Sequence, residues 1–195
     1  MALRALCVFC GASPGNRPEY AAAAEALGRT LAERGIELVF GGGGIGMMGT
    51  LARAALAAGA RVTGVIPEAL QKRELALPGM SELHVVGSMH ERKALMAERS
   101  DGFVALPGGF GTLEEFFEVL TWAQLGFHAK PVALLDVGGF YAPLMAALQH
   151  MEREGYIRPG QMDLILVDSD IGRLLGRMDG YRAPPAPRWI HKGET

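Results

Sequence analysis

Apolar and polar positions along the 195-residue chain follow two alternating patterns. Short, predominantly apolar runs are typical of strands buried on both faces, and they occur at residues 5–9, 36–40, 61–66, 83–86, 102–106, 131–135 and 164–167. Segments with helical spacing lie between them, at 18–34, from the first glycine run to about 58, and at 88–100, 112–125, 142–154 and 169–178. Strands that alternate with helices predict an α/β fold, an open parallel sheet with helices on both faces.

Length and composition are those of one ordinary globular domain. With 49% hydrophobic and 21% charged residues, the chain can bury a substantial core. We assign residues 1–180 to a single domain and residues 181–195 to a tail that is too rich in proline to continue a helix. The net charge of −2, the absence of a leader pattern and the absence of a long apolar run predict a cytoplasmic protein with no nucleic-acid or membrane partner.

Two glycine-rich loops, at residues 41–49 and 107–112, each follow an apolar strand and open a helix. Glycine lets the backbone approach an anion, and a helix start offers unpaired N–H donors, so a phosphate held between the two loops is one interpretation. The first loop also matches G-x-G-x-x-G at Gly44, Gly46 and Gly49, but it follows the second strand rather than the first. A loop that only packs a helix against a strand explains that run equally well.

The second loop continues into Thr112, Glu114 and Glu115. Thr112 with Glu115 three residues later has the spacing of a capping box, and this pattern alone favours capping over catalysis. The preceding glycines are denser than a cap needs, however, and a helix start favours the charged form of a carboxylate. A role for Glu115 as a permanent anion in catalysis therefore stays open beside the capping interpretation.

Basic residues gather on the helix expected at 88–100. Ser88 and Glu91 form a second capping box at its start, and Arg92 and Arg99 lie two turns apart on one face. Such residues form a solvated charged face by default. The alternative is that this basic group balances a phosphate or carboxylate across a cleft.

Cys7 and Cys10 form a C-x-x-C pattern on the first expected strand. Positions three apart on a strand point to opposite faces, so we expect two buried free thiols rather than a redox pair or a metal site. The histidines show no metal-ligand spacing either.

Residues 107–115 carry P-G-G-x-G-T-x-x-E, and residues 89–93 carry M-H-x-R-K. Together these motifs resemble the LOG (Lonely Guy) family of cytokinin riboside 5′-monophosphate phosphoribohydrolases. Supporting matches lie at 9–13, 41–49 and 121–126.

The resemblance implies a Rossmann-like domain, a homodimer and no cofactor. It implies hydrolysis of the N-glycosidic bond of N6-substituted adenosine 5′-monophosphates, and of AMP as a second candidate, to free base and ribose 5-phosphate. Arg92 and Glu115 take the catalytic roles, and whether Arg92 positions the nucleotide or balances charge on the departing base stays open. With candidates from the supporting matches, the implied substrate contacts are Ser13, Gly43, Gly44, Glu74, Arg92, Lys93, Gly108, Gly109, Phe110, Gly111, Thr112, Leu113, Glu114 and Thr121.

Proteins of this family are often labelled lysine decarboxylases. A pyridoxal-phosphate enzyme needs a Schiff-base lysine, and Lys72, Lys93, Lys130 and Lys192 lie in no recognisable cofactor pocket. Two different functions stay open beside the phosphoribohydrolase: a nucleoside-monophosphate nucleosidase with little base preference, and a non-enzymatic carrier of a nucleotide or of molybdenum cofactor. A carrier has no need for both Glu115 and Arg92.

Overall fold

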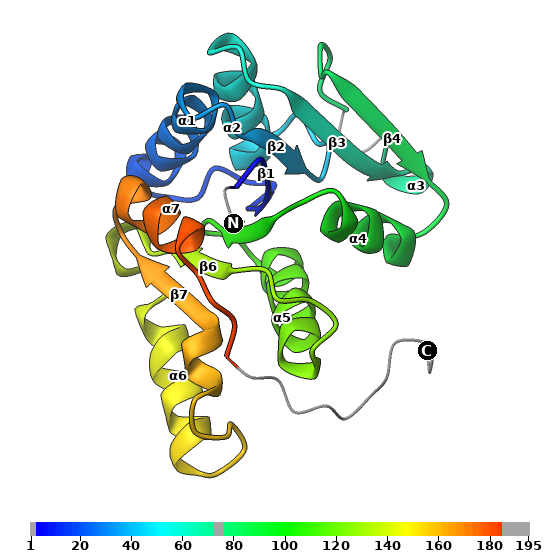
Figure 1. The fold of residues 1–195 in the computed structure, drawn as a ribbon. Helices are drawn as coiled ribbons and strands as arrows, with labels where there is room; N and C mark the ends of the chain where they lie inside the picture. The colour runs from blue at the N-terminus through cyan, green and yellow to red at the C-terminus, as the bar shows by residue number, and fades with distance from the viewer. Residues whose placement is uncertain (1–2, 72–75, 185–195) are drawn as a thin grey trace.

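The computed structural model describes residues 3–71 and 76–184. In this part of the chain, parallel strands form one sheet in the order β4-β3-β2-β1-β5-β6-β7 (Figure 1). They are β1 (Ala5–Phe9), β2 (Glu37–Phe40), β3 (Val62–Pro67), β4 (Glu82–Val86), β5 (Gly102–Ala105), β6 (Val132–Leu135) and β7 (Ile165–Asp168). The predicted parallel sheet is confirmed. Glu74 and most of the tail expected at 181–195 lie outside the described residues.

Two layers of helices cover the sheet (Figure 1). One face carries α1 (Pro18–Glu33), α2 (Gly46–Ala57) and α7 (Ile171–Asp179), and the other carries α4 (Met89–Glu98), α5 (Phe110–Leu125) and α6 (Ala142–Arg153). Alternate side chains of each strand enter the two cores. Cys7 belongs to one core and Cys10 to the other, both as free thiols, which confirms their predicted opposite orientation.

After β3 the chain forms a short surface helix, α3 (Glu68–Gln71), and Ala76 then makes an isolated antiparallel bridge with Gly43 in the loop after β2. The last helix differs from its predicted bounds. α7 begins at Ile171, two residues later than expected, because the Asp170 side chain caps it by accepting a backbone hydrogen bond at 2.7 Å.

The chain changes its direction across the sheet at β1. From β1 it runs outward through β2 and β3 to the edge strand β4, and α4 then returns it to β5 on the other side of β1. The loops that leave β1 and β5 therefore diverge at the carboxyl edge of the sheet, which is where open α/β sheets bind ligands. The loops that follow β1, β2 and β5 all begin at this edge.

Candidate active site

A cavity of about 420 Å³ opens at the point where the loops after β1 and β5 diverge. Its walls come from these two loops, from the starts of α1, α2 and α5, and from α4. The lining residues are Cys10, Gly11, Ala12, Ser13, Gly15, Tyr20, Met47, Met48, Arg92, Pro107, Gly108, Gly109, Gly111, Thr112, Glu115 and Phe140. The cavity thus lies between the second glycine loop and the loop after β1, and the start of α2, which carries Met47 and Met48, forms a further wall.

The first glycine run packs the fold around the cavity. From residues 41–49, only Met47 and Met48 line it. A Cβ at Gly41 would lie 2.0 Å from Nη2 of Arg92, so a larger residue would displace the guanidinium. The first glycine run was interpreted either as a phosphate-binding loop or as a loop that packs a helix against a strand. Its contacts support the packing interpretation.

Arg92 is held in place from three sides. Its Nε donates to the carbonyl of Val65 at 3.1 Å, and its Nη2 donates to the carbonyl of Gly41 at 3.4 Å. Nη1 lies 3.3 Å from Oε1 of Glu115, and the two side chains are only 7% and 11% exposed. The expectation of a solvated face is therefore wrong for Arg92, whose guanidinium is fixed at the cavity wall.

The capping-box prediction for Thr112 and Glu115 is wrong. α5 begins two residues earlier than expected, with Gly109 at its N-cap and no side chain capping it. A Cβ at Gly108 would lie 2.1 Å from Oγ1 of Thr112, so the glycine loop folds tightly over the first turn and Thr112 is buried. Glu115 consequently falls in the second turn, where it pairs with Arg92.

The start of α5 has the features of an anion-binding site. The first hydrogen bond of the helix runs from the N–H of Leu113 to the carbonyl of Gly109 at 3.1 Å. The N–H groups of residues 110–112 precede that bond and have no partner within the helix, and the helix dipole adds positive potential there. Ser13 adds a hydroxyl from the loop after β1. An anion in the cavity can therefore reach donors from two loops.

Several residues of the implied substrate set lie outside the cavity. Lys93 forms ion pairs with Glu114 and, at 3.0 Å, with Glu118. Burial works against the charge of Lys93, but these carboxylates outweigh burial and raise the pKa of the ammonium. Thr121 is exposed further along α5, and its hydroxyl donates to the carbonyl of Phe117. The residues of the set that do not line the cavity are Gly43, Gly44, Lys93, Phe110, Leu113, Glu114 and Thr121.

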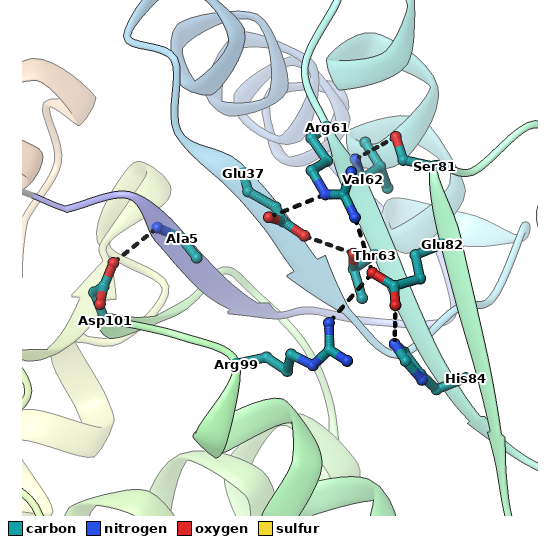
Figure 2. A network of polar contacts seen from close by, with 10 residues as sticks. All are labelled: Ala5, Glu37, Arg61, Val62, Thr63, Ser81, Glu82, His84, Arg99 and Asp101. Atoms are coloured by element: carbon teal, nitrogen blue, oxygen red, sulfur yellow. Dashed lines mark hydrogen bonds and ion pairs between the residues drawn. The ribbon is translucent and has the colours of Figure 1, made fainter.

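Arg99 lies far from Arg92. It caps the C-terminal end of α4 and reaches Oε2 of Glu82 at 3.2 Å, where Arg61 also binds at 2.9 Å (Figure 2). This network lies at the starts of β2, β3 and β4, the amino edge of the sheet (Figure 2). The prediction of one basic group formed by Arg92 and Arg99 is therefore wrong, because α4 carries them to opposite edges.

An aromatic wall of the cavity was not predicted from the sequence. Tyr20 and Phe140 line it with their ring centroids 5.6 Å apart and their planes at 78°. Tyr20 lies in the first turn after the β1 loop, and Phe140 follows the turn after β6. Their position beyond the carboxyl ends of strands was the signal that could have identified them.

The described residues offer few other reactive groups. Burial, and then the charge of Glu115, raise the pKa of the Cys10 thiol, so it stays protonated and is a poor nucleophile. Neither lysine in the described ranges lines the cavity: Lys93 is paired as above, and Nζ of Lys130 donates to the carbonyl of Ala97 at 2.7 Å. Nowhere in these ranges do three or more His, Cys, Asp or Glu side chains gather as a metal site would require.

Within the same ranges, every helix is too short or too polar to cross a lipid bilayer.

Comparison with known proteins identifies relatives. A family model described as "Possible lysine decarboxylase" matches residues 48–178. The cytokinin riboside 5′-monophosphate phosphoribohydrolase of Rhodococcoides fascians is 51% identical over 182 residues, which are 93% of this chain and 90% of that protein. The cytokinin riboside 5′-monophosphate phosphoribohydrolase LOG1 of Arabidopsis thaliana is 47% identical over 176 residues, 90% of this chain and 83% of that protein.

Solved structures of similar fold include molybdenum-cofactor proteins. The carrier protein of Chlamydomonas reinhardtii has a TM-score of 0.66 at 23% identity, over 88% of this chain and 93% of that one. The cofactor binding protein of Rippkaea orientalis has a TM-score of 0.69 at 22% identity, over 92% and 98%. At such identities the likeness concerns the fold alone. Because the family model spans more than half of the chain, and the phosphoribohydrolases match nearly its whole length, the chain belongs to the LOG family.

Proposed function

We propose that this protein hydrolyses the N-glycosidic bond of N6-substituted adenosine 5′-monophosphates and releases the free base and ribose 5-phosphate. The observation that carries the proposal is the buried Arg92–Glu115 pair beside the anion-binding start of α5. Relatives whose sequences are 51% and 47% identical to this chain are named for this reaction. AMP itself is a second candidate substrate.

The 5′-phosphate would bind at the start of α5. The N–H groups of residues 110–112 lie at the N-terminal end of α5, where the helix dipole favours a negative charge. Ser13 adds a donor from the opposite wall. Glu115 lies three residues after Thr112, about 4.5 Å further along the helix axis. A phosphate bound at the helix start therefore leaves the ribose beside the carboxylate of Glu115.

Glu115 would then act on the sugar. Cleavage of a glycosidic bond passes through a transition state that resembles an oxocarbenium ion. The Glu115 carboxylate stabilises this cation and orients a water molecule. The water oxygen bonds to C1′ as the bond from C1′ to the base nitrogen breaks, and the proton released by the water ends on the base. Arg92 aligns the carboxylate, and it either positions the nucleotide or balances charge on the departing base.

We extend the proposal to the surface outside the cavity. Lys93, Glu114 and Thr121 would contact the part of the nucleotide that reaches beyond the cavity, and Glu74 stays a predicted contact. The chain would act in the cytoplasm as a homodimer, with no nucleic-acid or membrane partner. Its likeness to LOG proteins supports the dimer.

Product analysis with purified protein tests the reaction. The wild type, Glu115→Gln and Glu33→Gln are incubated with N6-isopentenyl-AMP and with AMP, and base and ribose 5-phosphate are quantified. Glu33 is an exposed glutamate at the end of α1, so its variant controls for the loss of one carboxylate. We expect Glu115→Gln to bind nucleotide but to hydrolyse it about a thousandfold more slowly, because the cation loses its counter-charge.

The outcomes separate the candidate functions. Free base from the wild type and from Glu33→Gln, but not from Glu115→Gln, supports the proposal. Similar rates on nucleotides with unrelated bases would favour a general nucleosidase. Tight nucleotide binding without cleavage by the wild type would favour a carrier. Full activity of Glu115→Gln would contradict the mechanism even if the reaction were correct.

A further inference from the structure

Tyr141 lies directly behind the second glycine loop. It precedes α6 as its N-cap residue and is only 1% exposed. Its hydroxyl donates a hydrogen bond of 2.6 Å to the carbonyl of Leu106, the residue before the Pro107–Gly109 segment. Tyr141 is not among the residues that line the cavity, so any effect on a ligand must pass through this loop.

The bond falls where β5 leaves the sheet. The N–H of Leu106 donates to the carbonyl of Phe9 at 2.9 Å, as in a regular parallel ladder. In such a ladder the next bond would run from the N–H of Gly11 to the carbonyl of Leu106. Instead, the N–H of Gly11 donates to the carbonyl of Pro107 at 3.1 Å. The ladder is displaced by one residue, and the hydroxyl of Tyr141 supplies a donor to the Leu106 carbonyl that this displacement releases.

Tyr141 is itself firmly placed. Its N–H donates to Oδ1 of Asp136 at 2.7 Å, and its ring packs edge-on against Phe140 at 5.0 Å. Burial is the main cause that raises the pKa of the hydroxyl, and the electrostatic interactions with Cys10 and Asp136 act in the same direction. The group therefore stays protonated and remains a donor at any physiological pH.

We propose that Tyr141 is a positioning residue for phosphate binding, because its hydrogen bond to Leu106 holds the glycine loop in the displaced register. In that register the loop approaches the chain after β1, and the first N–H groups of α5 face the cavity. Without the hydroxyl, the N–H of Gly11 can return to the Leu106 carbonyl, which draws Pro107 and the following glycines away from the ligand. The inference rests on the proposed function in assigning the phosphate to this loop.

Tyr141→Phe removes the hydroxyl and keeps the ring. Calorimetric titration with ribose 5-phosphate should show a Kd raised about tenfold, because the loss of one buried hydrogen bond lets the glycine loop leave its binding geometry. Tyr156→Phe is the matched control, because it makes the same change at a residue that is 86% exposed. In turnover, Tyr141→Phe should raise KM more than it lowers kcat, since Arg92 and Glu115 stay in place.

A purely structural role predicts a different result. A less stable protein contains fewer binding-competent molecules but has the same Kd, as we expect for Leu175→Ala in the buried core under α7. An unchanged Kd for Tyr141→Phe at a lowered Tm would therefore overturn the proposal, and so would a wild type that does not bind ribose 5-phosphate. If Tyr141→Phe does not fold, Asp136→Ala gives the same test through the anchor of Tyr141, with an expected rise in Kd of about threefold.

The binding measurement needs no turnover, so it decides the role of Tyr141 separately from the proposed reaction. If the wild type binds ribose 5-phosphate but releases no base from N6-isopentenyl-AMP or AMP, only the proposed function is contradicted.

Discussion

Two arginines of α4 meet glutamates at opposite edges of the sheet, in very different surroundings. At the carboxyl edge, the side chains of Arg92 and Glu115 are 7% and 11% exposed. At the amino edge, those of Arg99 and Glu82 are 40% and 31% exposed and belong to a network of alternating charges (Figure 2). The same ion-pair chemistry is thus buried at a cavity wall near one end of α4 and exposed to water at the other end.

The difference in burial determines what each pair can do. An exposed pair is screened by water and salt and adds little to stability. The amino-edge network mainly joins neighbouring strands, for example where Oγ1 of Thr63 on β3 donates to Oε1 of Glu37 on β2 at 2.6 Å. A buried pair has lost its hydration, so removal of one partner leaves a charge without compensation. Only the buried pair can therefore act strongly on a bound ligand.

Replacement of each arginine by methionine should give the largest contrast. We expect Arg92→Met to lose nearly all hydrolysis and to lower the Tm by about 10 °C, because Glu115 then stays buried without its cation. Arg99→Met, on the same helix, should keep wild-type activity and lower the Tm by about 2 °C or less. Product analysis and thermal unfolding of both variants make the comparison.

A double variant shows whether the buried pair is the cause. Arg92→Met with Glu115→Gln removes both charges, so it should recover most of the Tm lost by Arg92→Met, while activity stays absent. A Tm as low as that of the single variant would attribute the loss to the contacts of Arg92 with Val65 and Gly41 instead.

Local sequence signals predicted the elements that depend on local contacts. Predominantly apolar runs such as 36–40 and 131–135 indicated strands because both faces of a central strand are buried. The cap at the start of α4 was equally clear, and Oγ of Ser88 does accept the N–H of Glu91 at 3.1 Å. These features involve residues close together in the sequence.

The candidate site depends on contacts that local patterns do not contain. Thr112 and Glu115 have the spacing of a cap, but Gly108 above Thr112 and Arg92 beside Glu115 give both residues other partners. The first glycine run was ambiguous for the same reason, since Gly41 makes room for a side chain from α4. The family motifs identified the two charged residues, while only the fold shows how they meet.

His128 tests whether burial, rather than the edge of the sheet at which a group lies, determines how strongly the group's charge affects stability. This residue precedes β6 at the amino edge but is partly buried, and its Nδ1 accepts the N–H of Lys130 at 3.1 Å. Burial lowers its pKa, the charge of Lys130 lowers it further, and the contact with the carbonyl of Val119 only partly opposes them. The native state therefore disfavours the proton that the unfolded chain accepts below about pH 6.5.

The stability of the protein should accordingly fall as the pH drops below about 6.5, and it should recover when the pH is raised. Between pH 8 and pH 5, the Tm of the wild type should fall by a few degrees more than that of His128→Gln, which cannot take up this proton. His150→Gln replaces a side chain that is 63% exposed, and its Tm should change with pH as the Tm of the wild type does. Equal slopes for the wild type and His128→Gln would show that partial burial at this edge has no effect on titration.

The smallest effect is expected for Glu82→Gln in the exposed network. Burial alone would raise the pKa of Glu82, but Arg61, Arg99 and His84 outweigh it and the pKa is lowered. Its contribution to stability is therefore present above the ordinary glutamate pKa of about 4.3 and is lost as the pH falls through the lowered value. At neutral pH and low salt, Glu82→Gln should lower the Tm by about 2 °C or less, and 1 M NaCl should remove the difference. A decrease in Tm that persists in 1 M NaCl, or one nearly as large as that of Arg92→Met, would contradict the distinction between the two edges. Either result would show that an exposed network behaves like a buried ion pair.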